Sequence, residues 1–96
     1  MNQNRLRIAN VRFTAAKATA IESGLIGWVS CILNNSLQLD GLALRRTRSG
    51  RPVLSFPSRL DSAGRQHFYL RPLDDRTRRE IERQVFEALG MKEGAR

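Results

Sequence analysis

The chain has 96 residues, a formal net charge of +8 and a single cysteine. A chain of this length forms one domain with a modest core, and it has no room for a catalytic domain beside a binding domain. One cysteine excludes an intramolecular disulfide. The longest apolar stretch, Leu25 to Leu33, is about half as long as a membrane-spanning helix. No apolar run follows Arg5 and Arg7, as it would in a signal peptide. The sequence therefore predicts a cytoplasmic protein that does not bind a membrane.

The positive charge is concentrated in one part of the chain. Residues 1–73 contain 11 basic and 3 acidic residues, which leaves +8, whereas residues 74–96 contain 6 of each. Nearly all the basic residues are arginines, and the planar guanidinium group suits bidentate contacts with phosphate. This balance indicates a polyanionic partner, with solubility alone as the alternative explanation.

The first strands are predicted from alternating apolar residues. Apolar and polar residues alternate from Ala9 to Ala15, as in a half-buried strand. Residues 25–33 are apolar on both faces, which favours a central strand covered by a helix on one side and by a partner subunit on the other. Asn34-Asn35 predicts a two-residue hairpin turn after it.

The next strands are shorter and are separated by turns. In the strand that begins at Leu37, the apolar residues switch faces after Asp40-Gly41, which predicts a β-bulge at Gly41. A turn with Gly50, a strand over 52–56, a turn over 61–64 and a strand over 66–70 follow.

The last element is a helix. Asp74 or Asp75 can cap its N-terminus, and Gly90 ends it. Its apolar stripe has helical spacing and consists of Ile81, Val85, Ala88 and Leu89. The predicted fold is therefore α+β, an antiparallel sheet of about five strands with a C-terminal helix packed on it. It forms a single domain over residues 1–96 with its core at about 8–89, and residues 1–4 and 91–96 are expected to be flexible.

Candidate catalytic residues are few. Cys31 lies within an apolar strand, where a buried and inert thiol is expected. His67 has no second His or Cys nearby to share a metal, and a hydrogen bond to Asp74 or Asp75 would account for it. No glycine-rich phosphate loop is present. The sequence therefore predicts a protein that is not an enzyme and has no cofactor, no metal and no small-molecule substrate.

The arginines of the helix and of the strand region differ in their surroundings. Helix charges are spaced to form i,i+4 ion pairs, namely Asp75–Arg79, Arg76–Glu80, Arg78–Glu82 and Arg83–Glu87. The helix is therefore expected to cover the sheet with a self-neutralised surface. In the strand region seven arginines face only Asp61, and they are the candidate nucleic-acid-binding residues: Arg45, Arg46, Arg48, Arg51, Arg59, Arg65 and Arg71.

Four of these arginines flank two turns at opposite ends of the strand over 52–56. The turns are therefore expected to form two basic tips, separated by about 17 Å or more. Trp28 and Phe68 are expected in the core, which leaves Tyr69 as a single exposed aromatic residue for base stacking. Contact with the phosphate backbone is therefore expected, rather than sequence reading.

The order of these features resembles the SpoVG family, the stage V sporulation protein G or septation regulators. The similarity covers about residues 8–89. It rests on Ala9-Asn10-Val11-Arg12, a strand pair, the turns with Gly50 and Gly64, Leu54-Ser55-Phe56-Pro57-Ser58-Arg59, Arg71-Pro72-Leu73 and the closing helix. Two departures are visible: Arg59-Leu60 stands where two basic residues often follow Pro-Ser, and Arg71-Pro72 stands where His-Pro is usual.

The resemblance implies a homodimer that associates through its sheet and binds DNA, and in some members RNA. It also implies a role in cell division, sporulation or gene regulation, with Arg12 and Arg59 as contact residues. The first hypothesis is therefore a nucleic-acid-binding regulator, with DNA preferred over RNA. The alternative is a non-catalytic protein-interaction module of cell-division regulation, which would dock a partner on a sheet edge or on the strand around Trp28.

Overall fold

A computed structural model describes residues 6–21 and 23–91 of the chain. The ends predicted to be flexible therefore lie outside the described residues, except for Met91. The elements, in chain order, are β1 (Ile8–Ala15), α1 (Ala18–Ile21), β2 (Leu25–Leu33), β3 (Leu37–Arg46), β4 (Pro52–Ser55), β5 (Ser58–Leu60), β6 (Gln66–Phe68) and α2 (Asp75–Ala88).

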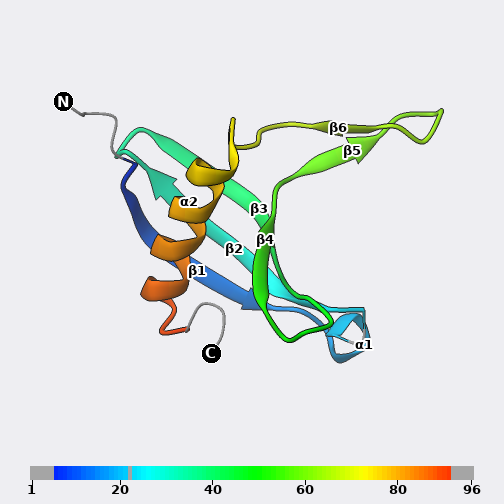
Figure 1. Ribbon diagram of the computed structural model, residues 1–96, viewed down its shortest axis with the longest axis horizontal. Coiled ribbons are helices and arrows are strands. Elements are labelled where there is room, and N and C mark those ends of the chain that lie inside the picture. Colours follow the sequence, from blue (N-terminus) through cyan, green and yellow to red (C-terminus); the bar gives the residue numbers. More distant parts are fainter. Residues whose placement is uncertain (1–5, 22, 92–96) are drawn as a thin grey trace.

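The strands form two separate antiparallel sheets (Figure 1). The larger has four strands in the order β1-β2-β3-β4, and β5 pairs only with β6 in a hairpin. The α+β class is confirmed, but the strand predicted over 66–70 does not extend the main sheet. Pro57 follows β4 and has no backbone N–H for a ladder, which favours the end of the strand there. The chain then leaves the sheet and pairs with itself.

Local backbone features agree with the predictions from the sequence. Asn34 and Asn35 have φ angles of 51° and 59°, as a two-residue hairpin turn requires. In the pairing of β2 with β3, the register passes from Val29 opposite Leu42 to Cys31 opposite Leu39. Because two residues of β3 then lie opposite one residue of β2, the bulge predicted at Gly41 is confirmed.

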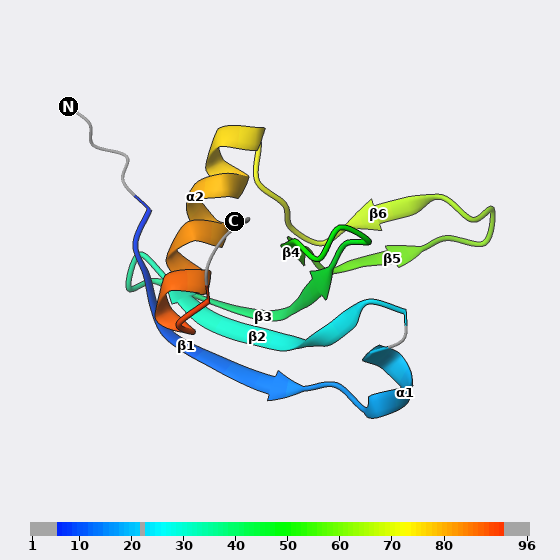
Figure 2. The same cartoon turned by 60° about the horizontal axis from the view of Figure 1, so that its bottom comes forward.

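The core lies between the four-stranded sheet and α2 (Figure 2). Buried side chains of the sheet include Val29, Leu42 and Leu44, and α2 contributes Ile81, Val85 and Phe86. Cys31 is 0% exposed in this core, as predicted. Burial, together with the charge of Asp40, raises the pKa of its thiol. The helix therefore covers one face of the sheet.

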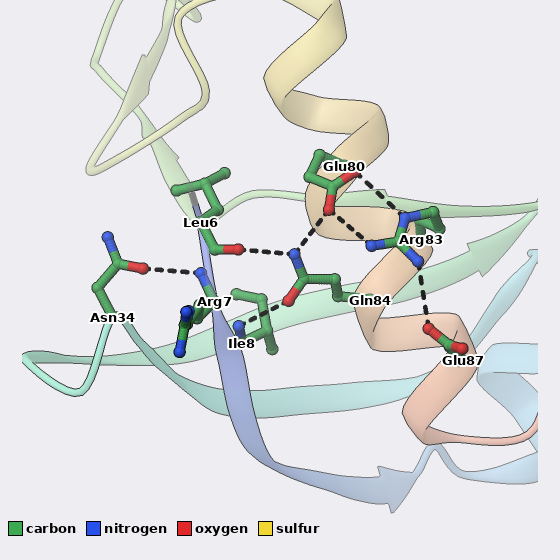
Figure 3. Close-up of polar contacts among 8 residues, drawn as sticks. All are labelled: Leu6, Arg7, Ile8, Asn34, Glu80, Arg83, Gln84 and Glu87. Carbon is green, nitrogen blue, oxygen red and sulfur yellow. Dashed lines mark hydrogen bonds and ion pairs between the residues drawn. The ribbon is translucent and has the colours of Figure 1, made fainter. Parts of the chain in front are cut away.

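Side chains of α2 also bond the backbone of both edge strands. Gln84 accepts a hydrogen bond from the Ile8 N–H (2.8 Å) and donates one to the Leu6 carbonyl (2.8 Å), beside the start of β1 (Figure 3). On β4, the Leu54 N–H donates to Glu82 over 3.0 Å. These bonds satisfy edge groups that would otherwise lack a partner within the sheet. They also fix the position of α2 along the sheet.

The ends of α2 are capped as the sequence predicts. Asp74 is the N-cap, and its carboxylate accepts a hydrogen bond of 2.8 Å from the Thr77 N–H. A hydrogen bond with the Thr77 side chain, together with this backbone bond, lowers the pKa of Asp74 and keeps a negative charge at the positive end of the helix dipole. Gly90, with φ 74°, follows the last turn.

The opposite face of the sheet is uncovered in the single chain. The register pairs Trp28 with Thr14 on one side and with Ala43 on the other, and alternation places these three residues on the face away from Val29 and Leu42. Trp28 was expected in the core but is 43% exposed. The prediction of a helix on one side of β2 is therefore confirmed, whereas no part of the described chain covers the other side.

Gly27→Ala is expected to destabilise the fold by about 1–3 kcal/mol through overpacking. A Cβ atom at this position would overlap the Thr14 carbonyl oxygen and would lie 2.5 Å from Cε1 of Phe13. Urea unfolding of both proteins measures the difference. Gly50→Ala is a control for steric effects, because no atom lies within 4 Å of its added Cβ, although its φ of 90° carries a strain of its own. A Gly27→Ala protein as stable as the wild type would contradict the close strand packing.

Candidate nucleic-acid interface

The seven candidate arginines lie in three places. Arg45 and Arg46 end β3, Arg48 and Arg51 belong to the β3–β4 turn (residues 47–51), and the rest lie on the arm. The arm comprises β5, β6, the tip between them and the three following residues (residues 58–71). As predicted, the two turns are separate: the β3–β4 turn precedes β4, whereas the arm leaves from its far end (Figure 1). The arginines therefore do not form one continuous surface.

The β3–β4 turn is held together by its own backbone. The Gly50 N–H donates to the Thr47 carbonyl (2.8 Å), and the Thr47 N–H donates to the Arg51 carbonyl (2.9 Å). Arg46 donates from Nη1 to the Gly50 carbonyl over 2.8 Å, so its guanidinium stabilises the turn. Among the described residues, the guanidinium groups of Arg48 and Arg51 have no acidic partner. These two arginines carry the free charge of the turn.

A cavity of about 590 Å³ lies between this turn and α2. Thr47, Ser49 and Arg51 line it from the turn, and Arg78 and Arg79 line it from the helix. This site was not predicted from the sequence, because the turn and the helix that line it are far apart along the chain. Both helix arginines are paired with acids, so the uncompensated positive charge of the cavity comes from Arg51.

The ion pairs of α2 largely match the predicted ones. Asp75–Arg79 (3.0 Å), Arg78–Glu82 (3.0 Å) and Arg83–Glu87 (3.2 Å) are formed, and Figure 3 shows that Arg83 also pairs with Glu80. Pairs of this kind contribute only about 0.2–0.5 kcal/mol each. They nevertheless compensate most of the charge on the surface of the helix, as predicted.

At the tip of the arm, Asp61 neutralises part of the charge. Its carboxylate accepts hydrogen bonds from Nε of Arg65 (3.1 Å) and from the Ala63 N–H (2.9 Å), and it bonds Nε2 of His67 (2.8 Å). The bond with His67 is the largest of the contacts that lower the pKa of Asp61. Arg65 therefore pairs with Asp61, the one acid expected near these arginines. The prediction for His67 is corrected: it bonds Asp61 rather than Asp74 or Asp75, because β6 pairs with β5.

The remaining arginines of the arm differ in their contacts. Arg59 has no acidic partner among the described residues. The guanidinium of Arg71 lies over the ring of Phe68, 5.6 Å from its centroid, in a cation–π contact. Phe68 was expected in the core but is 42% exposed, because β6 stays outside the main sheet. Tyr69 is 68% exposed, in agreement with the prediction.

Arg45 lies on the uncovered face of the sheet. It pairs with Val53, two positions along from the pair of Ala43 with Ser55, and alternation puts it on the same face as Trp28. Arg45 is half-buried, so less of its charge is available to a ligand than at the turns. With Arg46, Arg65 and Arg71 engaged as described, the freely exposed cations of the seven are Arg48, Arg51 and Arg59.

No model of a known protein family matches the chain, and no curated protein is significantly similar to it. Neither helix in the described part of the chain is long and apolar enough to cross a membrane.

Proposed function

We propose that the protein is a non-enzymatic, nucleic-acid-binding regulator that acts in the cytoplasm as a homodimer. The observation that carries the proposal is the position of the free cations. Arg48 and Arg51 lie on one turn and Arg59 lies on the arm, all exposed and without an acidic partner among the described residues. Exposed guanidinium groups without acidic partners are available to phosphates.

The mode of binding follows from the spacing of these cations. The turn and the arm leave opposite ends of β4, so they would contact phosphates at separate points along a nucleic-acid backbone. Such contacts give affinity and orientation but little reading of sequence. The helix is less suited to this role, because Arg78, Arg79 and Arg83 are held by Asp75, Glu80, Glu82 and Glu87.

Dimerisation would use the uncovered face of the sheet. Trp28 is 43% exposed there, with half-buried Ile32 on the same face of the same strand. A second copy packed on this face would bury these side chains and double the number of basic tips. The resemblance to the SpoVG family supports the dimer, binding of DNA more than RNA, and a regulatory role in septation or sporulation.

The runner-up is a protein-interaction module of cell-division regulation, and the exposed Trp28 favours it. On that hypothesis the uncovered face receives a different protein, and the arginines serve solubility. Charge reversal at Arg59 separates the two functions, because it removes a phosphate contact without altering the face around Trp28.

A salt titration tests the proposal. If a dimer neutralises about six phosphates, through three free arginines on each chain, log K is expected to fall with log salt at a slope of about −5. Fluorescence anisotropy with labelled DNA and RNA between 50 and 300 mM salt (roughly the range in which such contacts are measurable) gives this slope. Arg59→Glu should weaken binding about tenfold or more and make the slope shallower. A slope near zero, or no binding at the lowest salt concentration, would contradict the proposal.

A further inference from the structure

The arm has almost no support from its own chain. β5 and β6 pair over three residues each, from Ser58 opposite Phe68 to Leu60 opposite Gln66, and they project away from α2 and the main sheet (Figures 1 and 2). An isolated two-stranded hairpin is only marginally stable in water. Large apolar side chains are nevertheless exposed in and just after the arm: Leu60, Phe68, Tyr69, Leu70 and Leu73. Apolar surface on a projecting hairpin is typical of a binding element.

A cavity of about 390 Å³ lies where the arm joins the body of the protein. Phe68 and Arg71 line it from the arm, and Leu54 and Phe56 provide buried apolar side chains from β4 and the residue after it. Its polar lining includes Gln66, Ser55, Asp74 and Asp75. This volume lies in the range of small-ligand sites, and the combination of apolar walls and a few polar groups is typical of them.

The charge of the arm indicates what the cavity receives. Three arginines and one aspartate give the arm a balance of +2, and the whole chain carries +8. A second copy of this chain would bring like charge to the arm, whereas a nucleic acid brings the opposite charge. An aromatic ring beside a guanidinium group is also the pair on which proteins stack unpaired bases.

We infer that this cavity binds one unpaired nucleobase, stacked on Phe68, and that the protein therefore prefers single-stranded over duplex nucleic acid. The inference rests on the proposed function. A base in a duplex is stacked between its neighbours and cannot enter the cavity. Insertion between the ring and the guanidinium needs about 6.8 Å, twice the stacking distance of about 3.4 Å. Because Arg71 is now 5.6 Å from the ring centroid, its exposed side chain would move outward by about 1 Å or turn to a neighbouring phosphate.

The test compares one labelled 12-nucleotide strand with the duplex of the same sequence, by anisotropy at constant salt. Wild type is expected to bind the single strand more tightly. Phe68→Leu keeps apolar volume but removes the ring, and it should weaken single-strand binding about tenfold while leaving duplex binding within about twofold. Phe13→Leu is the matched control, since Phe13 is 41% exposed against 42% for Phe68 and lies on β1. It should leave both affinities unchanged.

A second measurement leaves the protein unaltered. A series of strands, each with one base replaced by an abasic site, should show at least one position whose loss weakens binding about tenfold. If every abasic strand binds wild type equally and Phe68→Leu matches Phe13→Leu, the base-binding cavity is wrong, although the salt-dependent binding of the proposed function would stand. If neither strand nor duplex binds at any salt concentration, the proposed function itself fails, and a protein partner becomes the occupant of the arm.

Discussion

Replacing Arg48, Arg51 and Arg59 together with glutamine is expected to weaken nucleic-acid binding by at least about 100-fold at 0.1 M salt. Each lost phosphate contact costs about 0.9 in log K for each tenfold difference in salt below 1 M, so the three contacts of one chain account for about two to three orders of magnitude, and those of both chains of a dimer for about twice as many. These side chains have no acidic partner among the described residues, so their loss should leave the fold intact. Anisotropy titrations at several salt concentrations measure both the affinity and its slope.

The matched control removes the same charge from α2. Arg76→Gln, Arg79→Gln and Arg83→Gln also lower the net charge by three, but Arg79 and Arg83 are paired with acids of the helix, and Arg76 lies close enough to Asp74 for its charge to help lower the pKa of that carboxyl. Their combined effect should be less than about fivefold, and the salt slope should not change. Equal losses in the two triple variants would mean that binding follows the net charge alone, and the assignment to the turn and the arm would be wrong.

Features that depend on neighbouring residues were predictable from the sequence. The turn at Asn34-Asn35 and the bulge at Gly41 could be predicted, because each is determined by the backbone conformation of a few neighbouring residues. The N-cap at Asp74 was predictable for the same reason. Three of the four ion pairs predicted from the i,i+4 spacing of the helix are formed.

Features that depend on distant pairing were not predictable. Whether residues 66–68 add to the main sheet depends on competition between β4 and the segment after Pro57, and local patterning does not decide it. The exposure of Phe68 and the bond between His67 and Asp61 both follow from that pairing. Trp28 looks like a core residue in the sequence because an apolar residue in a strand has the same pattern whether its own chain or another molecule covers it.

The acidic residues of α2 serve the fold as well as its charge balance. Glu82 is 9% exposed and bonds the Leu54 N–H, while its carboxylate also pairs with Arg78. Asp74 caps the helix. These acids are therefore committed within the body of the protein, and they are not free to neutralise the arginines of the turn and the arm. The positive charge available to a ligand therefore lies on the turn and on the arm, where arginines have no acidic partner among the described residues.

The fold and the arm should respond separately to the loss of a phenylalanine. Phe86 is 2% exposed in the core, and Phe86→Ala is expected to cost about 3–5 kcal/mol of unfolding free energy. The total for a domain of this size is roughly 5–14 kcal/mol. The urea midpoint should therefore fall by about 2 M.

Phe68→Ala removes the same side chain from the arm, where it is 42% exposed and outside the core cluster. Its midpoint should fall by less than about 0.5 M, because little buried contact is lost. It should weaken single-strand binding, whereas Phe86→Ala, measured where it is still folded, should not. A Phe68→Ala protein as unstable as Phe86→Ala would show that the arm packs on the body, and its apolar residues would then belong to the fold rather than to a ligand.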